Sequence, residues 1–420
     1  MLGFVAAYAV NLFHYDIWDV FQPSFGQKST WDLFSMQFGS QRIGLGILMS
    51  EILMRLSQWN ARAESFAVAL TFMLSAGVAL RLKWKLFREW SWWDLLLVFQ
   101  MLSLASWESI VGTPFLAFSS VPLLLILLSA YTRLIANGII RAGVTLLAIV
   151  VMLYSSQSIL AVPAMCFLMG CDFIRASRRQ DQLAILVVLI LSGIATFYLV
   201  ATHDRTIVGT ACFDTVVVGA WDYLLFVGAY TLSLFGWYMY VPGVAVVGIG
   251  IFFGLLLIWL RGIKRLLDRR NAEPISEIIF FLLGFTLLHG CAAAYGRACL
   301  GTRAAYTSRY FPYMLPGYIA VYFWILSKSK PQIKKIGLGF LCLSHLVLEI
   351  FLYGRQLPKV KAELISREAV RACLVEGGEL LECEKLVGFQ IHPSSEKAQI
   401  SGRVEFLRNH RLGPFQLNGR

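Results

Sequence analysis

Charged residues are scarce in this chain of 420 residues. Asp, Glu, Lys and Arg together make up 15% of it, against about 25% in an ordinary soluble domain. Hydrophobic residues make up 58%. This composition excludes a soluble globular enzyme, a disordered chain and a fibrous repeat, and it predicts a membrane protein with many spans.

Several common sequence motifs are also missing. The eight cysteines include no CxxC pair, so we do not expect a zinc or redox site. The chain has no Walker loop, GxSxG, HExxH or dinucleotide-binding fingerprint in a suitable context. This argues against ATP-driven transport by this chain alone. It also has no internal repeat, which is a common feature of secondary transporters.

The apolar residues fall into segments that are long enough to cross a bilayer. A helix needs roughly 20 apolar residues for this. Residues 1–13 are apolar but short, and we interpret them as the end of a first span or as a tilted span. The other candidate spans are 62–82, 93–112, 113–130, 139–157, 158–173, 183–201, 241–260, 275–296, 309–327 and 336–353. They predict an all-α polytopic bundle of about eleven transmembrane helices.

Basic residues cluster in the short connections between these spans. The four clusters lie in 81–88, 175–179, 261–270 and 328–335 and explain much of the net charge of +12. Short basic loops stay on the cytoplasmic side of a membrane, so we place the N-terminus inside and the C-terminus outside. The clusters also suit contact with anionic lipid headgroups. We therefore expect the lipid bilayer, and not a nucleic acid, as the partner of this charge.

This orientation puts three segments outside the membrane. They are a first loop over 14–61, a second loop over 202–240, and a small C-terminal region over 354–420 that follows the transmembrane domain 1–353. If this C-terminal region faces an oxidising compartment, Cys373 and Cys383 could pair there. Their spacing alone leaves the pairing open.

Two segments of the outer loops are predicted to lie at the membrane surface. Residues 43–58 carry an apolar stripe at helical spacing, with Glu51 and Arg55 four apart on the polar side. We interpret this segment as an interfacial helix. Residues 222–238 are rich in aromatic side chains, so we expect them to lie along the outer surface or to re-enter the membrane.

The first outer loop carries acidic residues directly after the first apolar segment. Asp16 and Asp19 are the two acids nearest the membrane. A carboxylate there can act as a general base toward a hydroxyl group or can hold a divalent ion. The alternative is a solvated acid or an interfacial hydrogen-bond acceptor. His14, beside these acids, is more typical of a hydrogen-bonded interface residue than of a ligand.

A second group of candidate residues is basic and lies in a short outer loop. Arg297, Arg303 and Arg309 fall in the sequence GRACLGTRAAYTSRY, on the side where the positive-inside pattern does not explain them. The arginine fork matches phosphate oxygens, so we predict a phosphate or pyrophosphate site, to which Arg42 is a further contributor. The alternative is that these arginines pair with acids such as Glu108, which lies near the outer end of a span.

Several short patches resemble one family when they are taken in order. They are a WD-containing first loop that ends in QR before the amphipathic helix, then WES, then GR and SRY, and finally IHP and FLRNHRLGPF. Together they resemble bacterial multi-pass membrane proteins that look like glycosyltransferases of the GT-C superfamily. The resemblance implies transfer of a sugar from a polyprenyl-phosphate carrier to a glycan or lipid acceptor of the cell envelope, at the outer face of the plasma membrane.

The resemblance also implies roles for single residues. Asp16 or Asp19 would be the catalytic acid of the first loop and would remove the proton of the acceptor hydroxyl. The arginines would stabilise the charge that builds on the leaving lipid phosphate. The first loop lacks an adjacent pair of acids, so a need for Mg²⁺ or Mn²⁺ stays open. The residues expected to line the substrate pocket are His14, Trp107, Glu108 and Tyr310.

Two other classes of protein remain alternatives. A transporter or flippase for an anionic lipid or glycan would carry polar residues through the middle of several spans, and this chain has few. A non-catalytic membrane subunit would keep Glu108 and the arginines tied up in pairs, with no cavity at the outer face.

Overall fold

The computed structural model describes residues 1–21, 29–39, 41–204, 218–235, 243–268, 273–392 and 400–416. It is 81% helical, and the hairpin of β1 (Gln37–Phe38) and β2 (Gln41–Arg42) pairs antiparallel. The predicted all-α class is confirmed. Among the described residues, six helices are long and apolar enough to cross a membrane, so the apolar segments do form membrane-spanning candidates.

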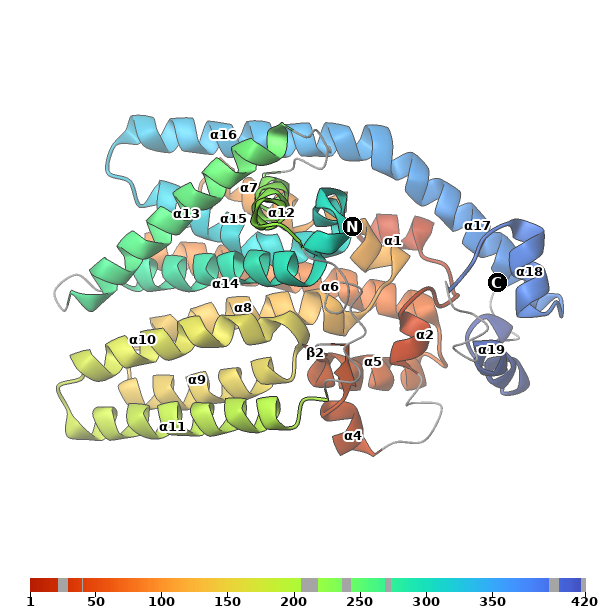
Figure 1. Cartoon of the computed structure of the whole chain (residues 1–420), viewed down its shortest axis with the longest axis horizontal. Coiled ribbons are helices and arrows are strands. Elements are labelled where there is room, and N and C mark those ends of the chain that lie inside the picture. The colour runs from red at the N-terminus through yellow and green to blue at the C-terminus, as the bar shows by residue number, and fades with distance from the viewer. Residues whose placement is uncertain are drawn as a thin grey trace.

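The six long helices run along the bundle and make up most of it (Figure 1). They are α6 (Ala61–Phe87), α10 (Val162–Arg175, with the preceding 3₁₀ turn Ser156–Ala161), α11 (Arg179–Ala201), α13 (Val244–Leu267), α14 (Pro274–Arg297) and α16 (Pro331–Phe351, which continues through a π-helical turn into α17, Leu357–Val375). Shorter apolar helices fill the spaces between them. These are α7 (Leu95–Met101), α8 (Ser120–Tyr131), α9 (Gly138–Leu153), α12 (Ala220–Ser233) and α15 (Phe311–Leu326).

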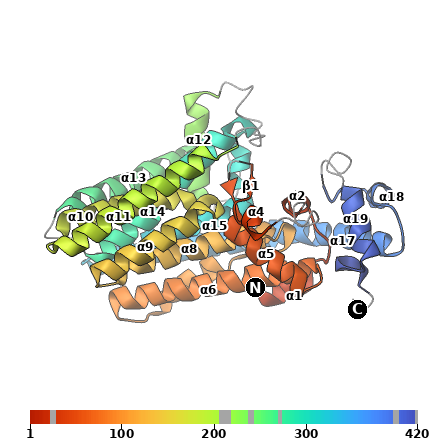
Figure 2. The same cartoon turned by 90° about the horizontal axis from the view of Figure 1, so that it is seen from below.

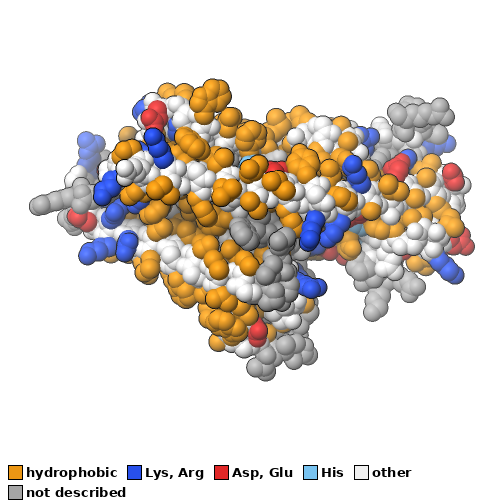
Figure 3. All heavy atoms as spheres, turned by 90° about the horizontal axis from the view of Figure 1, so that it is seen from above, with side chains coloured by type: hydrophobic (Ala, Val, Ile, Leu, Met, Phe, Trp, Pro, Cys, Tyr) orange, Lys and Arg blue, Asp and Glu red, His pale blue; other side chains and the backbone are white. Residues whose placement is uncertain are grey.

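The helices differ in how much of their surface is buried. In α14, 67% of the most apolar 18-residue stretch is buried, whereas the buried share of the corresponding stretch is 22% in α11 and 17% in α13. The outer helices expose large apolar side chains such as Phe197 and Val247. In Figure 3 hydrophobic side chains cover much of the face that α13 and α16 form. Broad exposed apolar surface of this kind is typical of contact with lipid.

The two ends of the bundle carry different segments (Figures 1 and 2). We call one the basic end; it holds the end of α6 and the connections α10–α11, α13–α14 and α15–α16. We call the other the loop end. It holds α1 (Leu2–Tyr8), α2 (Ile17–Val20), α4 (Thr30–Phe34), α5 (Gly44–Leu56), the α14–α15 connection, α17, α18 (Leu380–Val387) and α19 (Ile400–Asn409). The four basic connections predicted to be cytoplasmic thus lie together, opposite the first loop and the C-terminal region. The N-terminus, also predicted to be cytoplasmic, lies instead at the loop end, because the seven-residue α1 is too short to cross the bundle.

Several predicted spans are shorter or less regular in the structure. Residues 1–13 contain only the seven-residue α1. The span predicted over 93–112 stops as an α-helix at Met101 and continues as a 3₁₀ turn (Leu104–Ser106) and a π-helical turn (Glu108–Gly112). The following span begins only at Ser120. The predicted continuous helices are wrong here, because Ser103 caps a new turn through its side chain.

The segment predicted to lie on the outer surface packs inside the bundle instead. It forms α12, whose side chains from Phe226 to Ser233 are buried, and α12 contacts α13, α14 and α15. Gly228 permits this packing, because a Cβ atom there would lie 2.2 Å from the carbonyl oxygen of Ala245. The surface alternative is therefore wrong, and the re-entrant alternative remains. The rest of the predicted loop, at 205–217 and 236–240, lies outside the described residues.

The predicted interfacial helix is present as α5, but its polar pair lies differently from the prediction. Glu51 is buried and binds Arg55, with 2.7 Å between Oε1 and Nε. The apolar side chains of Met49, Ile52 and Leu56 are exposed. A helix of a soluble protein would turn these apolar side chains inward. The outward apolar face fits a helix that rests on a membrane.

The C-terminal region shares a hydrophobic core with the first loop. Trp18, Phe21 and Trp59 belong to the same buried cluster as Val370 and Leu407. This second core lies at the loop end and is separate from the main core of the helix bundle. The predicted C-terminal region therefore packs as a cap on the first loop.

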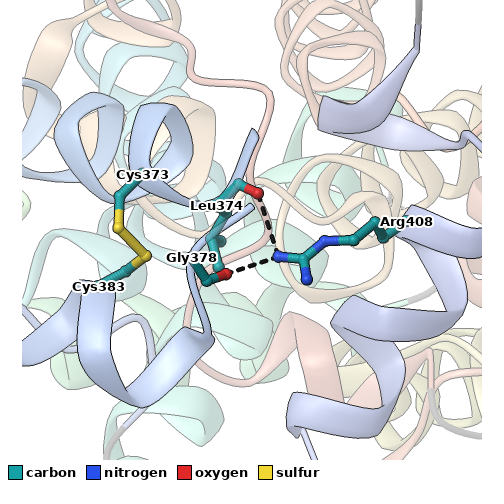
Figure 4. Close-up of a disulfide and its surroundings, with 5 residues drawn as sticks. All are labelled: Cys373, Leu374, Gly378, Cys383 and Arg408. Carbon is teal, nitrogen blue, oxygen red and sulfur yellow. Dashed lines mark hydrogen bonds between the residues drawn. A yellow bond between two sulfur atoms is a disulfide. The ribbon is translucent and has the colours of Figure 1, made fainter. Parts of the chain in front are cut away.

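A disulfide between Cys373 and Cys383 joins α17 to α18, so the predicted pairing is confirmed (Figure 4). Close by, Arg408 of α19 donates hydrogen bonds to the carbonyl oxygens of Leu374, at 3.1 Å, and Gly378, at 2.6 Å. The disulfide and these hydrogen bonds together fix the turn between α17 and α18.

Removing this disulfide should loosen the C-terminal cap. We expect the double variant Cys373→Ser/Cys383→Ser to lose about 2–4 kcal/mol of stability, because the bond restricts the unfolded chain. Limited proteolysis of the purified protein should then show faster cleavage within 354–420. Cys342→Ser changes an exposed free cysteine on α16 and should leave the pattern unchanged. Equal cleavage rates in the wild type and the double variant would contradict this role.

Candidate functional site

Arg309 lies at the centre of a cluster of charged side chains at the loop end. Its Nη2 lies 2.8 Å from Oε1 of Glu108, and its Nε donates to the same oxygen at 2.9 Å. Its Nη1 lies 3.7 Å from Oδ2 of Asp16. Ser308 donates from Oγ to the other oxygen of Glu108 at 3.0 Å. The structure thus brings together an acid of the first loop, an acid at the end of a predicted span and an arginine of the α14–α15 connection.

Local structure keeps Asp16 at the surface. Tyr15 has a positive φ of 50°, and its backbone N–H donates to the carbonyl oxygen of Ile391 at 2.7 Å. The short helix α2 that follows buries Ile17 and Trp18. The side chain of Asp16 is left 43% exposed. The carboxylate is therefore open to solvent and to an incoming substrate.

Glu108 and Arg309 are held by irregular backbone. Glu108 begins a π-helical turn, a feature that often marks functional sites. Arg309 lies in a 3₁₀ turn, Ser308–Tyr310, directly before α15. These turns are in contact with one another. Their packing orients the guanidinium group before any substrate arrives.

The charges of this cluster reinforce one another. Burial opposes the charge of Arg309, but the carboxylates of Glu108 and Asp16 outweigh burial and raise the pKa of the guanidinium. Burial likewise raises the pKa of Tyr310, although Arg297 and Arg309 act in the opposite direction. Arg309 is therefore a permanent cation, and the hydroxyl group of Tyr310 stays protonated beside it.

The other predicted arginines play different parts. Arg297, at the end of α14, is exposed and forms no ion pair within the described part of the chain. Arg303 is exposed in the neighbouring 3₁₀ turn, Thr302–Tyr306. Arg42 donates hydrogen bonds to the carbonyl oxygens of Ser35 and Thr202, and so ties the first loop to the end of α11. Arg42 thus has a structural explanation, whereas Arg297 lies beside Tyr310 with its charge unneutralised.

Asp19 has different partners from Asp16. Its Oδ2 lies 3.0 Å from Nε2 of His392, and its Oδ1 lies 3.6 Å from Nη1 of Arg403. Arg403 also donates to the carbonyl oxygen of Trp18. Asp19 therefore joins α2 to the C-terminal region. Sequence reasoning left Asp16 and Asp19 equivalent, and the structure separates them.

His14 and Trp107 lie behind the charged cluster. His14 is 1% exposed, and its Nδ1 lies 3.3 Å from the carbonyl oxygen of Gly112 and 3.6 Å from Oε1 of Glu363. The ring of Trp107 covers Gly112, since a Cβ atom there would lie 3.2 Å from it. The ring of His14 has almost no open surface in this structure, and its contact with a substrate stays a prediction.

One residue that positions the site, Arg367, was not predicted from the sequence. Arg367 of α17 is buried and donates to the carbonyl oxygens of Val111, at 2.6 Å, and Leu12, at 3.0 Å. These two acceptors lie just beside Glu108 and Asp16 in the sequence. The guanidinium group of Arg367 thus joins the segment that precedes Asp16 to the segment that follows Glu108. Nothing in the sequence distinguishes Arg367 from the other basic residues of an amphipathic helix.

The environment of His14 predicts a pH dependence of stability. Burial and the nearby charge of Arg367 lower the pKa of His14 from 6.5 to about 2. The unfolded chain therefore binds a proton below pH 6.5 that the folded chain does not, and stability falls as the pH drops. At pH 5 the loss is about 2 kcal/mol relative to pH 7. Thermal unfolding at the two pH values should show it, and His14→Gln should reduce the difference. An unchanged difference in His14→Gln would exclude this histidine as the cause.

The cluster does not fit a divalent metal ion. Within the described ranges there is no group of three or more His, Cys, Asp or Glu side chains that could hold one. Asp16 and Glu108 are instead bridged by Arg309, whose positive charge takes the place that a cation would need. We therefore assign no step to Mg²⁺ or Mn²⁺.

A groove of about 1020 Å³ lies between α1, α7 and α16. Its walls are mostly apolar, but Ser103 donates from Oγ to Oε1 of Glu349 at 2.7 Å, and Nδ1 of His345 lies 2.9 Å from Oε1 of Gln100. The single turn Leu104–Ser106 separates Ser103 from Trp107 and Glu108, and this turn contacts the one that carries Arg309. The groove thus reaches the neighbourhood of the charged cluster.

Fold and site together define an all-α protein with membrane-spanning candidate helices and a charged cluster at one end. Comparison of the chain with family models, with curated proteins and with solved structures found no match.

Proposed function

We propose that this protein is a GT-C-type membrane glycosyltransferase of the bacterial plasma membrane. It would transfer a sugar from a polyprenyl-phosphate carrier to a glycan or lipid acceptor of the cell envelope, at the outer face. The observation that carries this proposal is the meeting of Asp16, Glu108 and Arg309 at the loop end of an apolar helix bundle. A base and a fixed cation within one site are the two groups that a single displacement at a sugar phosphate needs.

The contacts suggest how these groups divide the chemistry. Glu108 binds Arg309 closely and is further held by Ser308. Asp16 lies 3.7 Å from Arg309, which is too long for a strong hydrogen bond, and it is exposed. Asp16 is therefore the better base toward an acceptor hydroxyl. Arg309, oriented by Glu108, and the exposed Arg297 would stabilise the charge that grows on the leaving lipid phosphate.

The groove beside α7 and α16 suits a lipid carrier. Its apolar walls, which include Phe4, Phe99 and Leu346, match an isoprenoid chain. The polar side chains of Ser103 and Glu349 lie in the same groove, on the approach to the charged cluster. A carrier lying here would keep its chain in the bilayer and bring its phosphate toward Arg309.

Purified protein in liposomes provides the test. Synthetic polyprenyl-phosphate hexoses and pentoses should yield free polyprenyl phosphate when a mixture of envelope glycan and lipid acceptors is present. Cryo-electron microscopy with the donor added should show density between Asp16 and Arg309. Density that lies elsewhere, together with no turnover of any donor, would overturn the proposal.

One observation favours a second candidate function. The close pairing of Arg309 with Glu108 is also what a non-catalytic membrane subunit would show. In that case substitutions at Asp16 would affect neither turnover nor donor binding, but would change the association with a partner protein. Affinity purification of the wild type and the Asp16→Asn variant would separate the two functions.

A further inference from the structure

A small pocket at the basic end collects three cationic side chains. Its volume is about 160 Å³, and Arg261 and Arg265 of α13 line it together with Lys328 of the α15–α16 connection. Trp324 lies in the same wall. Figure 3 shows Lys and Arg side chains gathered at this end of the molecule. The pocket is far from the site proposed above, which lies at the loop end.

No acid of the described chain neutralises these three cations. None of them has a carboxylate oxygen within 4 Å in the described ranges, although Glu273 also lines the pocket. Burial and the charges of Arg265 and Arg261 lower the pKa of Lys328. Like charges that converge without a counterion destabilise the fold. An anion bound between them would relieve this repulsion.

Two other arginines at the same end are paired with acids, and one of them, Arg133, is buried. Arg133 lies 2.8 Å from carboxylate oxygens of both Asp172 and Glu277, and Arg175 lies 2.6 Å from Glu277. The chain thus supplies acids where a cation serves only the packing of helices. Arg261 and Arg265 are exposed and have no such acid at pairing distance among the described residues, so their guanidinium groups are open to an anion from outside the chain.

Two tryptophans of the pocket, Trp259 and Trp324, are typical of the depth of a lipid headgroup. Nζ of Lys328 stands 3.8 Å from the ring centre of Trp324, and Trp259 of the same pocket donates from its indole to the carbonyl oxygen of Phe280 at 3.1 Å. Tryptophans are enriched where a membrane meets water. Beyond them α13 exposes apolar side chains such as Leu257 and Phe253 along its length, where acyl chains would lie.

We propose that this pocket binds the phosphate group of an anionic phospholipid in the leaflet at the basic end. Two arginine forks and one ammonium group match the oxygens of a phosphodiester. The volume fits a phosphate with part of its headgroup, while the acyl chains stay outside against α13. The inference does not depend on the proposed glycosyltransferase activity.

Lipid retention by the full-length protein in mild detergent tests this proposal. Native mass spectrometry would be used to titrate phosphatidylglycerol, with phosphatidylcholine for comparison. In the triple variant Arg261→Gln/Arg265→Gln/Lys328→Gln, affinity for phosphatidylglycerol should fall roughly a hundredfold, because each cation that contacts the phosphate contributes about a fivefold step. Phosphatidylcholine binding should be weak throughout.

A charge-matched control separates a built site from diffuse attraction. The variant Lys330→Gln/Lys334→Gln/Lys335→Gln removes three positive charges at the same end, but none of these residues lines the pocket. It should keep near wild-type affinity. Equal losses in the two triple variants would overturn the proposal. Arg261→Lys/Arg265→Lys keeps the charge that sets topology and should still lose affinity severalfold, and full retention would overturn recognition by the arginine forks.

Competition with inorganic phosphate distinguishes a site for a lipid phosphate from a site for a free phosphate ion. In large excess it should not displace phosphatidylglycerol from the wild-type protein, because a lipid is also held by its acyl chains. Displacement by inorganic phosphate alone would mark the pocket as a site for a free anion and would overturn the lipid assignment.

Discussion

The variant Arg309→Gln is expected to lose sugar transfer by about 100-fold or more. Loss of one oriented group that stabilises charge in a transition state typically costs about 10²–10³ in rate. Arg309 is such a group, since Glu108 and Ser308 fix its position and its guanidinium faces Asp16. The measurement is the rate of release of polyprenyl phosphate from a synthetic sugar donor in liposomes.

Arg55→Gln is the matched control for this prediction. Arg55 also lies at the loop end and also pairs with an acid, Glu51, but its side chain is 66% exposed. Arg55 pairs with none of Asp16, Glu108 and Arg309, so the rate should stay close to that of the wild type. Arg309→Lys should recover only part of the rate, because an ammonium group cannot reproduce the contacts of the fork. Wild-type rates in Arg309→Gln would remove this residue from the site.

The second large effect is a division of roles between Asp16 and Asp19. Asp16→Asn should lower transfer by about 10²–10⁴-fold, the range by which a general base contributes, and leave stability nearly unchanged because the side chain is exposed. Asp19→Asn should lower stability more and transfer less than Asp16→Asn does. It weakens the contacts with His392 and Arg403 that hold the C-terminal region on α2, so it should speed proteolysis within 354–420 and lower transfer much less.

The two variants serve as controls for each other, since both remove one charge from the same loop. Transfer rate and proteolysis rate would be measured on the same preparations. If Asp19→Asn abolishes transfer while Asp16→Asn is active, the roles are exchanged. If both variants transfer at the wild-type rate, neither aspartate is the base.

Part of the candidate site could be predicted from the sequence, because few residues near the predicted outer ends of the apolar segments are ionisable. Asp16, Glu108 and Arg309 are all ionisable residues at the predicted outer ends of apolar segments. The alternative of an acid paired with arginine was also foreseen, and the structure shows Glu108 and Asp16 sharing Arg309. No local feature of the sequence favours Asp16 over Asp19, because their difference depends on His392 and Arg403, almost 400 positions away.

Composition and hydropathy by themselves determined the all-α class, the apolar helices and the grouping of basic connections at one end. These properties follow from local length, periodicity and charge, which do not depend on distant contacts. Tertiary structure alone decided that α12 is buried, that Glu51 lies inside, and that Arg367 joins two acidic segments. The physical reason is that burial and hydrogen bonding of a side chain depend on what packs against it, and the partners of these residues are remote in the chain.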